Sequence, residues 1–200
     1  MLGVRKGYNA LQRGRLSMGQ LVSGIGSEEF FYYFAYGSCM CPVDLKRSLR
    51  EPVWRYVLSP ATLVGYRLGF LWHAPWRNAG TLDIVPDARG RVEGVLYRLP
   101  WRLSARLDER EAVDRGGYRH ETVTVETCRG RVSGVRTYVV VDKLSEELPP
   151  DDGYCEVVLR GALTCGLSEQ YCWQLFEHMR ALQTRCASEG AVGRSRLVLR

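Results

Sequence analysis

The sequence over residues 33–40 joins an apolar strand to a turn of small residues. Residues 30–34 are aromatic throughout, which is typical of a buried strand. Gly37 and Ser38 break that strand, and Pro42 suits the first position of a following helix. Unpaired N–H groups in such a turn and at a helix N-terminus favour an anion. The alternative is a tight turn with a purely structural role.

The second candidate for chemistry is the carboxylate of Glu111. Leu103, Leu107 and Glu111 are spaced i, i+4 and i+8, which is one face of a helix predicted over residues 101–112. Burial on that face would raise the carboxyl pKa toward neutrality, where a general base works best. The alternative is a salt-bridged glutamate at a helix end. The neighbouring charged residues fall mostly on other faces and can stay in water, namely Asp108, Glu109, Arg110 and Asp114.

The positive charge of the chain lies at its ends. The net charge is +6 over 200 residues, with 28 basic and 22 acidic side chains. Seven of the basic residues and one of the acidic residues lie in 1–26 and 187–200, which leaves 21 of each between them. A neutral domain argues against a nucleic-acid partner. We predict a flexible extension over 1–27, one domain over 28–186 and a basic tail over 187–200.

The location and the cofactors are predicted from what the sequence lacks. No segment approaches the roughly 18 apolar residues of a membrane span, and the basic N-terminus has no apolar signal region. We therefore expect a cytoplasmic protein without a membrane partner, for which Met18 is an alternative start. The seven cysteines form no C-x-x-C and no zinc spacing. We expect reduced, packed thiols, no metal site and no cofactor.

The remaining segments predict an α+β fold with a small mixed β-barrel, or a strongly curved sheet, flanked by helices. Predicted strands cover 61–72 with a bend near Gly65 or Gly69, 81–85, 92–99, 122–127 and 132–141. Turns are expected at 87–90 and at Arg129-Gly130. Helices are expected over 154–163, beginning near Asp151-Asp152 and stopped by Gly166, and from the capping residue Ser168 to Leu182. The apolar stripe of the last helix is Tyr171, Leu175, Met179 and Leu182.

Several segments, taken in chain order, carry a family likeness. They are Tyr-Phe-Ala-Tyr-Gly-Ser at 33–38, Asn-Ala-Gly-Thr-Leu-Asp-Ile-Val-Pro at 78–86, Val-Glu-Gly-Val-Leu-Tyr at 92–97, Leu-Asp-Glu-Arg-Glu at 107–111 with Tyr118 after it, and a block with Pro149-Pro150, Tyr154 and Gly161-Ala162. In this order the segments resemble the gamma-glutamylcyclotransferase family over roughly residues 30–183. The chain departs from the family at Cys39, where asparagine is usual, and at Ala112, where glycine is usual.

The resemblance implies a small mixed β-barrel and an intramolecular reaction without a metal or cofactor. The free α-amine of a γ-glutamyl amine or amino acid attacks its own δ-carbonyl, which closes 5-oxoproline and releases the amine. Glu111 is implied as the catalytic acid and base. The implied substrate-binding residues are Tyr33, Phe34, Ala35, Tyr36, Gly37 and Ser38 in the loop, and Tyr118 and Tyr154 in the pocket. The expected partner is this small substrate, and the expected state is a monomer or homodimer.

Two other interpretations stay open from the sequence. The first is a non-catalytic relative that keeps the fold and binds a small ligand. The second is a cysteine hydrolase that uses Cys39 with His73 or His120, because a thiol after a glycine turn near a helix start can have a lowered pKa.

Overall fold

The computed structural model describes residues 28–197, with side chains described as far as residue 185. The predicted extension over 1–27 and the alternative start at Met18 lie outside the described residues.

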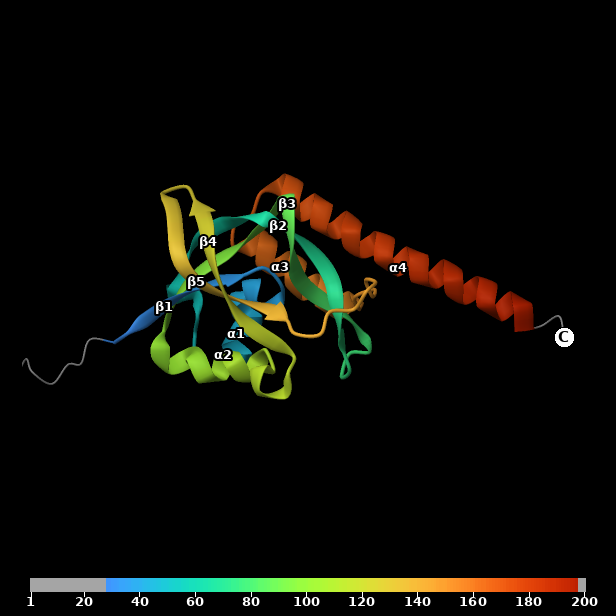
Figure 1. Ribbon diagram of the computed structural model, residues 1–200, viewed down its shortest axis with the longest axis horizontal. Helices are drawn as coiled ribbons and strands as arrows, with labels where there is room; N and C mark the ends of the chain where they lie inside the picture. The colour runs from blue at the N-terminus through green and yellow to red at the C-terminus, as the bar shows by residue number, and fades with distance from the viewer. Residues whose placement is uncertain (1–27, 198–200) are drawn as a thin grey trace, which may run out of the picture.

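Five strands close into a barrel in the order β1-β3-β2-β4-β5 (Figure 1). Their bounds are β1 Phe30–Ala35, β2 Val57–Ala74, β3 Ala79–Pro100, β4 Tyr118–Thr127 and β5 Gly130–Val140. β1 pairs antiparallel with β3 and parallel with β5, where Tyr33 lies opposite Arg136. This parallel pairing closes the sheet, so the predicted mixed α+β barrel is confirmed.

The turn expected at residues 87–90 is wrong, because β3 continues through them. β3 pairs with β2 in one long antiparallel hairpin, and the register shifts between Val64 and Tyr66, whose partners are Arg91 and Pro86. The glycine-containing segment 87–90 therefore bulges opposite Gly65, whose φ of 86° lies in the left-handed region. The predicted bend near Gly65 is confirmed by the same shift. Residues 87–90 have the composition of a turn, but they form an irregular part of the β2–β3 strand pair.

The helices begin and end close to the predicted positions, except at the C-terminal ends of the helix that precedes Glu111 and of the last helix. They are α1 Pro42–Leu49, α2 Ser104–Arg110, α3 Asp152–Thr164 and α4 Glu169–Leu197, with short 3-10 turns η1 Ser38–Met40, η2 Trp54–Tyr56, η3 Trp101–Leu103 and η4 Val113–Arg115. Asp151 accepts the N–H of Tyr154 at 2.9 Å, and Ser168 accepts that of Tyr171 at 3.2 Å, so both N-caps form. Gly166, with φ of 78°, follows α3 as predicted.

The last helix does not end near Leu182. α4 continues to Leu197, and its second half projects beyond the barrel (Figure 1). Its predicted apolar stripe is buried in the core, namely Tyr171, Leu175, Met179 and Leu182. Hydrophobic periodicity identifies only the part of a helix that packs, so it could not locate the end of a projecting one.

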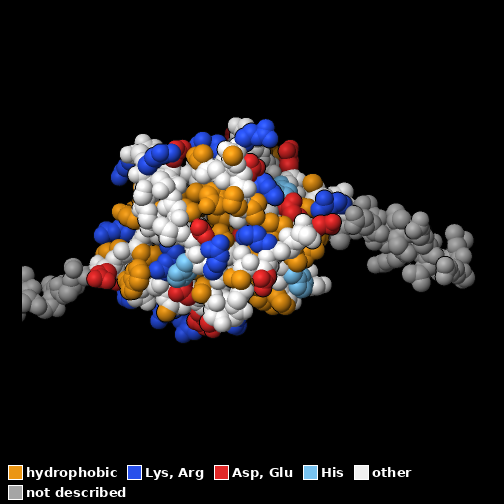
Figure 2. Space-filling model, viewed as in Figure 1, with side chains coloured by type: hydrophobic (Ala, Val, Ile, Leu, Met, Phe, Trp, Pro, Cys, Tyr) orange, Lys and Arg blue, Asp and Glu red, His pale blue; other side chains and the backbone are white. Residues whose placement is uncertain are grey.

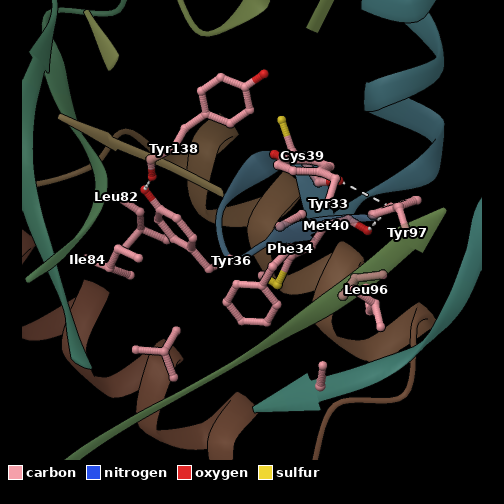
Figure 3. Packing of buried hydrophobic residues seen from close by; sticks show 14 of the residues in the cluster. Tyr33, Phe34, Tyr36, Cys39, Met40, Leu82, Ile84, Leu96, Tyr97 and Tyr138 are labelled. Carbon is pink, nitrogen blue, oxygen red and sulfur yellow. Dashed lines mark hydrogen bonds between the residues drawn. The ribbon is translucent and has the colours of Figure 1, made fainter. Parts of the chain in front are cut away.

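The core holds the loop after β1 in a fixed position (Figure 3). The Tyr97 hydroxyl donates to the backbone carbonyls of Cys39 and Met40, at 3.2 and 3.1 Å. The Tyr36 hydroxyl donates to the carbonyl of Tyr138 at 2.6 Å. α3 packs so closely on this loop that a Cβ at Gly161 would lie 2.6 Å from a backbone nitrogen. The loop is thus clamped between the barrel and α3.

Candidate active site

A cavity of about 230 Å³ opens where the loop after β1, the end of α2 and the start of α3 meet the barrel. It is smaller than the roughly 300–1,000 Å³ of sites for drug-sized ligands, so it suits a small metabolite. The lining residues are Tyr33, Tyr36, Gly37, Ser38, Cys39, Asp44, Trp72, Trp76, Arg77, Thr81, Leu82, Arg110, Glu111, Tyr118, Tyr138 and Tyr154.

The loop at the end of β1 presents backbone to the cavity. In η1 the N–H of Met40 donates to the carbonyl of Gly37 at 2.9 Å, and the next residue donates to Ser38 at 3.1 Å. The preceding N–H groups, those of Ser38 and Cys39, stand at the start of this turn and are left outside its hydrogen-bond pattern. A Cβ at Gly37 would lie only 3.2 Å from the Tyr154 hydroxyl. The loop can therefore bring amide groups close to an anion.

Glu111 faces the cavity from just beyond the end of α2. Its N–H donates to the carbonyl of Leu107 at 3.0 Å, but the helix ends at Arg110 because Ala112 turns into the left-handed region, with φ of 51°. The predicted helical end at residue 112 is thus too late. The inward direction expected from Leu103 and Leu107 still holds, since both leucines are buried and Glu111 lines the cavity.

Burial makes the carboxyl group of Glu111 a weaker acid than an exposed glutamate. Desolvation raises the pKa of its carboxyl above the usual value, and Asp108 adds to this rise. The nearby Arg110 guanidinium opposes it, as does the Cys39 thiol, which donates to Oε1 at 3.0 Å. The net direction is upward, toward the range in which a carboxylate is an effective proton acceptor near neutral pH.

The sequence led us to expect a solvated Arg110, but the structure buries most of its side chain. Its side chain is only 17% exposed and pairs with Asp44 at 2.6 Å. The same guanidinium donates to the Cys39 sulfur at 2.9 Å, to Ser48 at 2.6 Å and to Ser38 at 3.1 Å. Arg110 thus ties the loop to α1 beside the catalytic candidate. Its partners come from a distant part of the chain, so the local helical face could not reveal them.

Asp108 is likewise only half-exposed. It accepts from the Tyr138 hydroxyl at 2.5 Å and lies 2.6 Å from Nε2 of His120. This contact connects the outer end of α2 to two strands of the barrel.

The two pocket tyrosines form hydrogen bonds with the backbone of the same residue of β3. The Tyr118 hydroxyl donates to the carbonyl of Leu82 at 2.9 Å, and the Tyr154 hydroxyl accepts the N–H of Leu82 at 3.0 Å. Burial raises the pKa of both hydroxyls, so each stays protonated. The Tyr118 proton is committed to the Leu82 carbonyl, whereas the Tyr154 hydroxyl accepts at Leu82 and can donate its own proton to a ligand oxygen.

Most residues predicted for the site come together in the cavity. The lining includes Glu111 and the candidates Tyr33, Tyr36, Gly37, Ser38, Tyr118 and Tyr154. Phe34 and Ala35 lie outside it: Phe34 is wholly buried in the core, and the carbonyl of Ala35 packs against Gly94. Strand alternation turns Phe34 away from the face that Tyr33 presents. We therefore leave these two residues out of the proposed substrate site.

The sequence missed the lining residues supplied by the barrel strands, by the connection between β2 and β3, by α1 and by the end of α2. These are Asp44, Trp72, Trp76, Arg77, Thr81, Leu82, Arg110 and Tyr138. One usable signal was the pair of tryptophans flanking the expected end of a strand, directly before the family-like segment at 78–86. No local pattern aims the other side chains at this cavity.

The cysteine interpretation fails on geometry. Burial raises the pKa of the Cys39 thiol to about 12, so the thiolate is scarce at neutral pH. His73 lies 3.1 Å from the Asn78 side chain, His120 contacts Asp108, and neither histidine lines the cavity. Over residues 28–185, then, neither of the two proposed histidines is in place to activate Cys39.

The described part of the chain holds no cluster of three or more His, Cys, Asp and Glu side chains able to bind a metal. Within residues 28–197 no helix has the length and apolar character needed to cross a membrane. Lys and Arg side chains are interspersed with Asp and Glu on the face shown in Figure 2.

Comparison with known proteins identifies the family. The AIG2-like family model matches residues 91–175. The gamma-glutamylcyclotransferase of Mus musculus is 30% identical over 152 residues, which cover 72% of this chain and 76% of the mouse protein. The chain belongs to the gamma-glutamylcyclotransferase family. This membership supports an enzyme that catalyses a cyclisation.

Further similar proteins agree with this chain in sequence and fold. YkqA of Bacillus subtilis is 33% identical over 179 residues, 88% of this chain, and the chain spans 61% of the length of YkqA. The crystal structure of YkqA superposes with a TM-score of 0.70 at 31% identity, over 82% of this chain and 58% of that one. A solved gamma-glutamyl cyclotransferase gives a TM-score of 0.67 at 26% identity, over 74% of this chain and 86% of the other chain.

Proposed function

We propose that the protein converts a γ-glutamyl amine or amino acid into 5-oxoproline and releases the amine. The observation that carries this proposal is the half-buried carboxylate of Glu111, with an upward-shifted pKa, in a small cavity lined by tyrosines and backbone. Asp44, the other carboxylate in the lining, is paired with Arg110. A proton-transferring carboxylate with hydrogen-bond donors around it suits a reaction whose nucleophile and electrophile belong to the same substrate. The family membership of the chain supports the same reaction class.

In the proposed mechanism Glu111 relays two protons, one at a time, from the attacking nitrogen to the leaving nitrogen. The substrate α-amine is an ammonium near neutral pH and transfers a proton to the Glu111 carboxylate. The free amine then attacks the δ-carbonyl carbon, and a new C–N bond closes the five-membered ring. When the tetrahedral intermediate collapses, the bond to the leaving nitrogen breaks and Glu111 returns the proton to that nitrogen. The ring nitrogen still carries a surplus proton, which the carboxylate takes up and passes to the released amine, so the lactam is neutral and the amine leaves as an ammonium. The carboxylate is regenerated, and no outside co-reactant is consumed.

The other lining groups assist in binding. The N–H groups at Ser38 and Cys39 can hold the substrate carboxylate or the developing oxyanion. The hydroxyl of Tyr154 stays protonated and can donate to the same oxygens, while Tyr118, whose proton goes to the Leu82 carbonyl, shapes the pocket wall. A rigid pocket that folds the substrate into a near-attack shape supplies much of the rate, because the attack is already unimolecular.

The proposal is tested by release of 5-oxoproline. A panel of γ-glutamyl dipeptides and γ-glutamyl amines is incubated with the full-length protein and with its Glu111→Gln variant. We expect at least one compound to be cyclised, and kcat to fall by about 10²–10⁴ in the variant, as for a lost general base. A Gln variant with near wild-type turnover would refute the mechanism. A cytoplasmic location and a monomer or homodimer remain predictions from the sequence.

A further inference from the structure

The hairpin between β2 and β3 forms one rim of the cavity. Residues 75–78 connect the two strands, and they bring Trp76 and Arg77 into the lining. Trp76 is 69% exposed, and the Arg77 side chain is 34% exposed, whereas Tyr118 and Tyr154 beneath them are buried. The tip of the hairpin therefore lies at the open end of the cavity, on the solvent side of the buried tyrosines.

Arg77 is held in place by the first turn of α3. Its Nη1 donates to both carboxylate oxygens of Asp151, at 3.2 and 3.1 Å, and its guanidinium lies 5.6 Å from the centre of the Tyr154 ring. Asp151 is itself fixed as the N-cap of α3. The arginine is thus oriented before any ligand arrives, which lowers the entropic cost of binding.

The other edge of this guanidinium is open. Nε and Nη2 of Arg77 have no hydrogen-bond partner among residues 28–185, although that edge carries two parallel N–H groups suited to a carboxylate. Arg110, the second arginine in the lining, spends its donors on Asp44, Ser38, Ser48 and Cys39. Of the two lining arginines, Arg77 is therefore the better placed to bind an incoming anion.

An aromatic wall leads from the buried tyrosines to this rim. The rings of Tyr118 and Trp72 are 5.2 Å apart, and those of Trp72 and Trp76 are 5.3 Å apart, both edge to face. A largely exposed tryptophan at the end of such a wall offers an apolar face to a ligand. An aromatic leaving group is therefore a suitable probe of the rim.

We propose that the hairpin tip binds the departing half of the substrate and that Arg77 selects an α-amino acid there by pairing with its carboxylate. The inference rests on the proposed function, which puts the glutamyl half beside Glu111. It narrows the leaving group from any amine to one that carries a carboxylate, and it makes Arg77 a specificity-determining residue.

The test uses two substrates that differ only in that carboxylate, γ-glutamyl-phenylalanine and γ-glutamyl-phenethylamine. The wild-type protein should prefer the first by about 10–100-fold in kcat/KM, the value of a charge-assisted pair. In Arg77→Gln the ratio of the two kcat/KM values should fall to near one, and Arg77→Lys should be intermediate because it keeps the charge and loses the fork. Arg91→Gln removes an exposed arginine that pairs with Glu126 outside the cavity, and it should keep the wild-type ratio.

Three results would overturn the inference, and they can be told apart. A wild-type ratio near one would show that the rim ignores the carboxylate. An equal loss for both substrates in Arg77→Gln would mean that Arg77 supports the fold or binds the glutamyl carboxylate, which both substrates share. If neither probe nor any member of the dipeptide panel released 5-oxoproline, the proposed function would fail, and this inference with it.

Discussion

Replacing Arg110 by glutamine should move the acidic limb of the pH–rate profile to higher pH. The guanidinium favours the ionised form of Glu111, and the kcat/KM of the free enzyme rises with pH as that carboxyl loses its proton. Removing the positive charge leaves burial and Asp108 to raise the carboxyl pKa further. Asp44, freed from its 2.6 Å pair with Arg110, would act in the same direction.

The size of this effect follows from the geometry. The Cys39 sulfur lies 2.9 Å from Nε of Arg110 and 3.0 Å from Oε1 of Glu111, so the two charges are at most about 6 Å apart, and an effective dielectric of about 20 gives roughly 3 kcal/mol. That energy corresponds to about two pH units. Because the Arg110 side chain is 17% exposed, solvent screening reduces the expected movement to about one to two pH units.

The assay is 5-oxoproline release measured as kcat/KM over about pH 5 to 9. Arg106→Gln is the matched control, since Arg106 lies on the same helix and also joins α2 to α1, through the carbonyl of Leu49 at 2.7 Å, but does not line the cavity. Asp44→Asn breaks the same ion pair while it keeps the arginine charge, so it should not move the limb upward. If Arg110→Gln and Asp44→Asn gave the same profile, the electrostatic reasoning would be refuted.

Three further changes test the site. Glu111→Gln should raise the Tm near pH 8 relative to wild type. The folded protein holds the Glu111 proton to a higher pH than the unfolded chain does, so wild-type stability falls as pH rises through that interval, and the neutral variant escapes the loss. Equal pH dependence of Tm in both proteins would contradict this. Gly37→Val should abolish turnover, because its Cβ would sit 3.2 Å from the Tyr154 hydroxyl and its branches would fill the loop; full activity would exclude a close backbone contact with substrate. Cys39→Ala should keep kcat/KM within about tenfold, the value of one lost hydrogen bond, and iodoacetamide should not inactivate the wild type; an inactive variant with unchanged Tm would restore the cysteine mechanism.

Features encoded over a few residues were predictable from the sequence. Pro42 starts α1, Asp151 and Ser168 cap α3 and α4, and Gly130 turns the β4–β5 hairpin with φ of 118°. Each depends on the backbone preference of one residue or on a hydrogen bond to a near neighbour. The inward direction of Glu111 was predictable for the same reason, because helical spacing relates it directly to Leu107.

The tertiary structure decided everything that depends on pairing between distant segments. A turn-like composition at residues 87–90 became part of β3, since the partner strand shifts register at Gly65. Arg110 looked solvated on its own helix, yet the closed barrel brings Asp44 and Cys39 to within hydrogen-bond distance of it. Proline apart, local preferences are worth at most about 1 kcal/mol per residue, so the ion pairs and buried contacts made on closure override them. For that reason the sequence pointed to the acid, and only the fold supplied the charges that tune it.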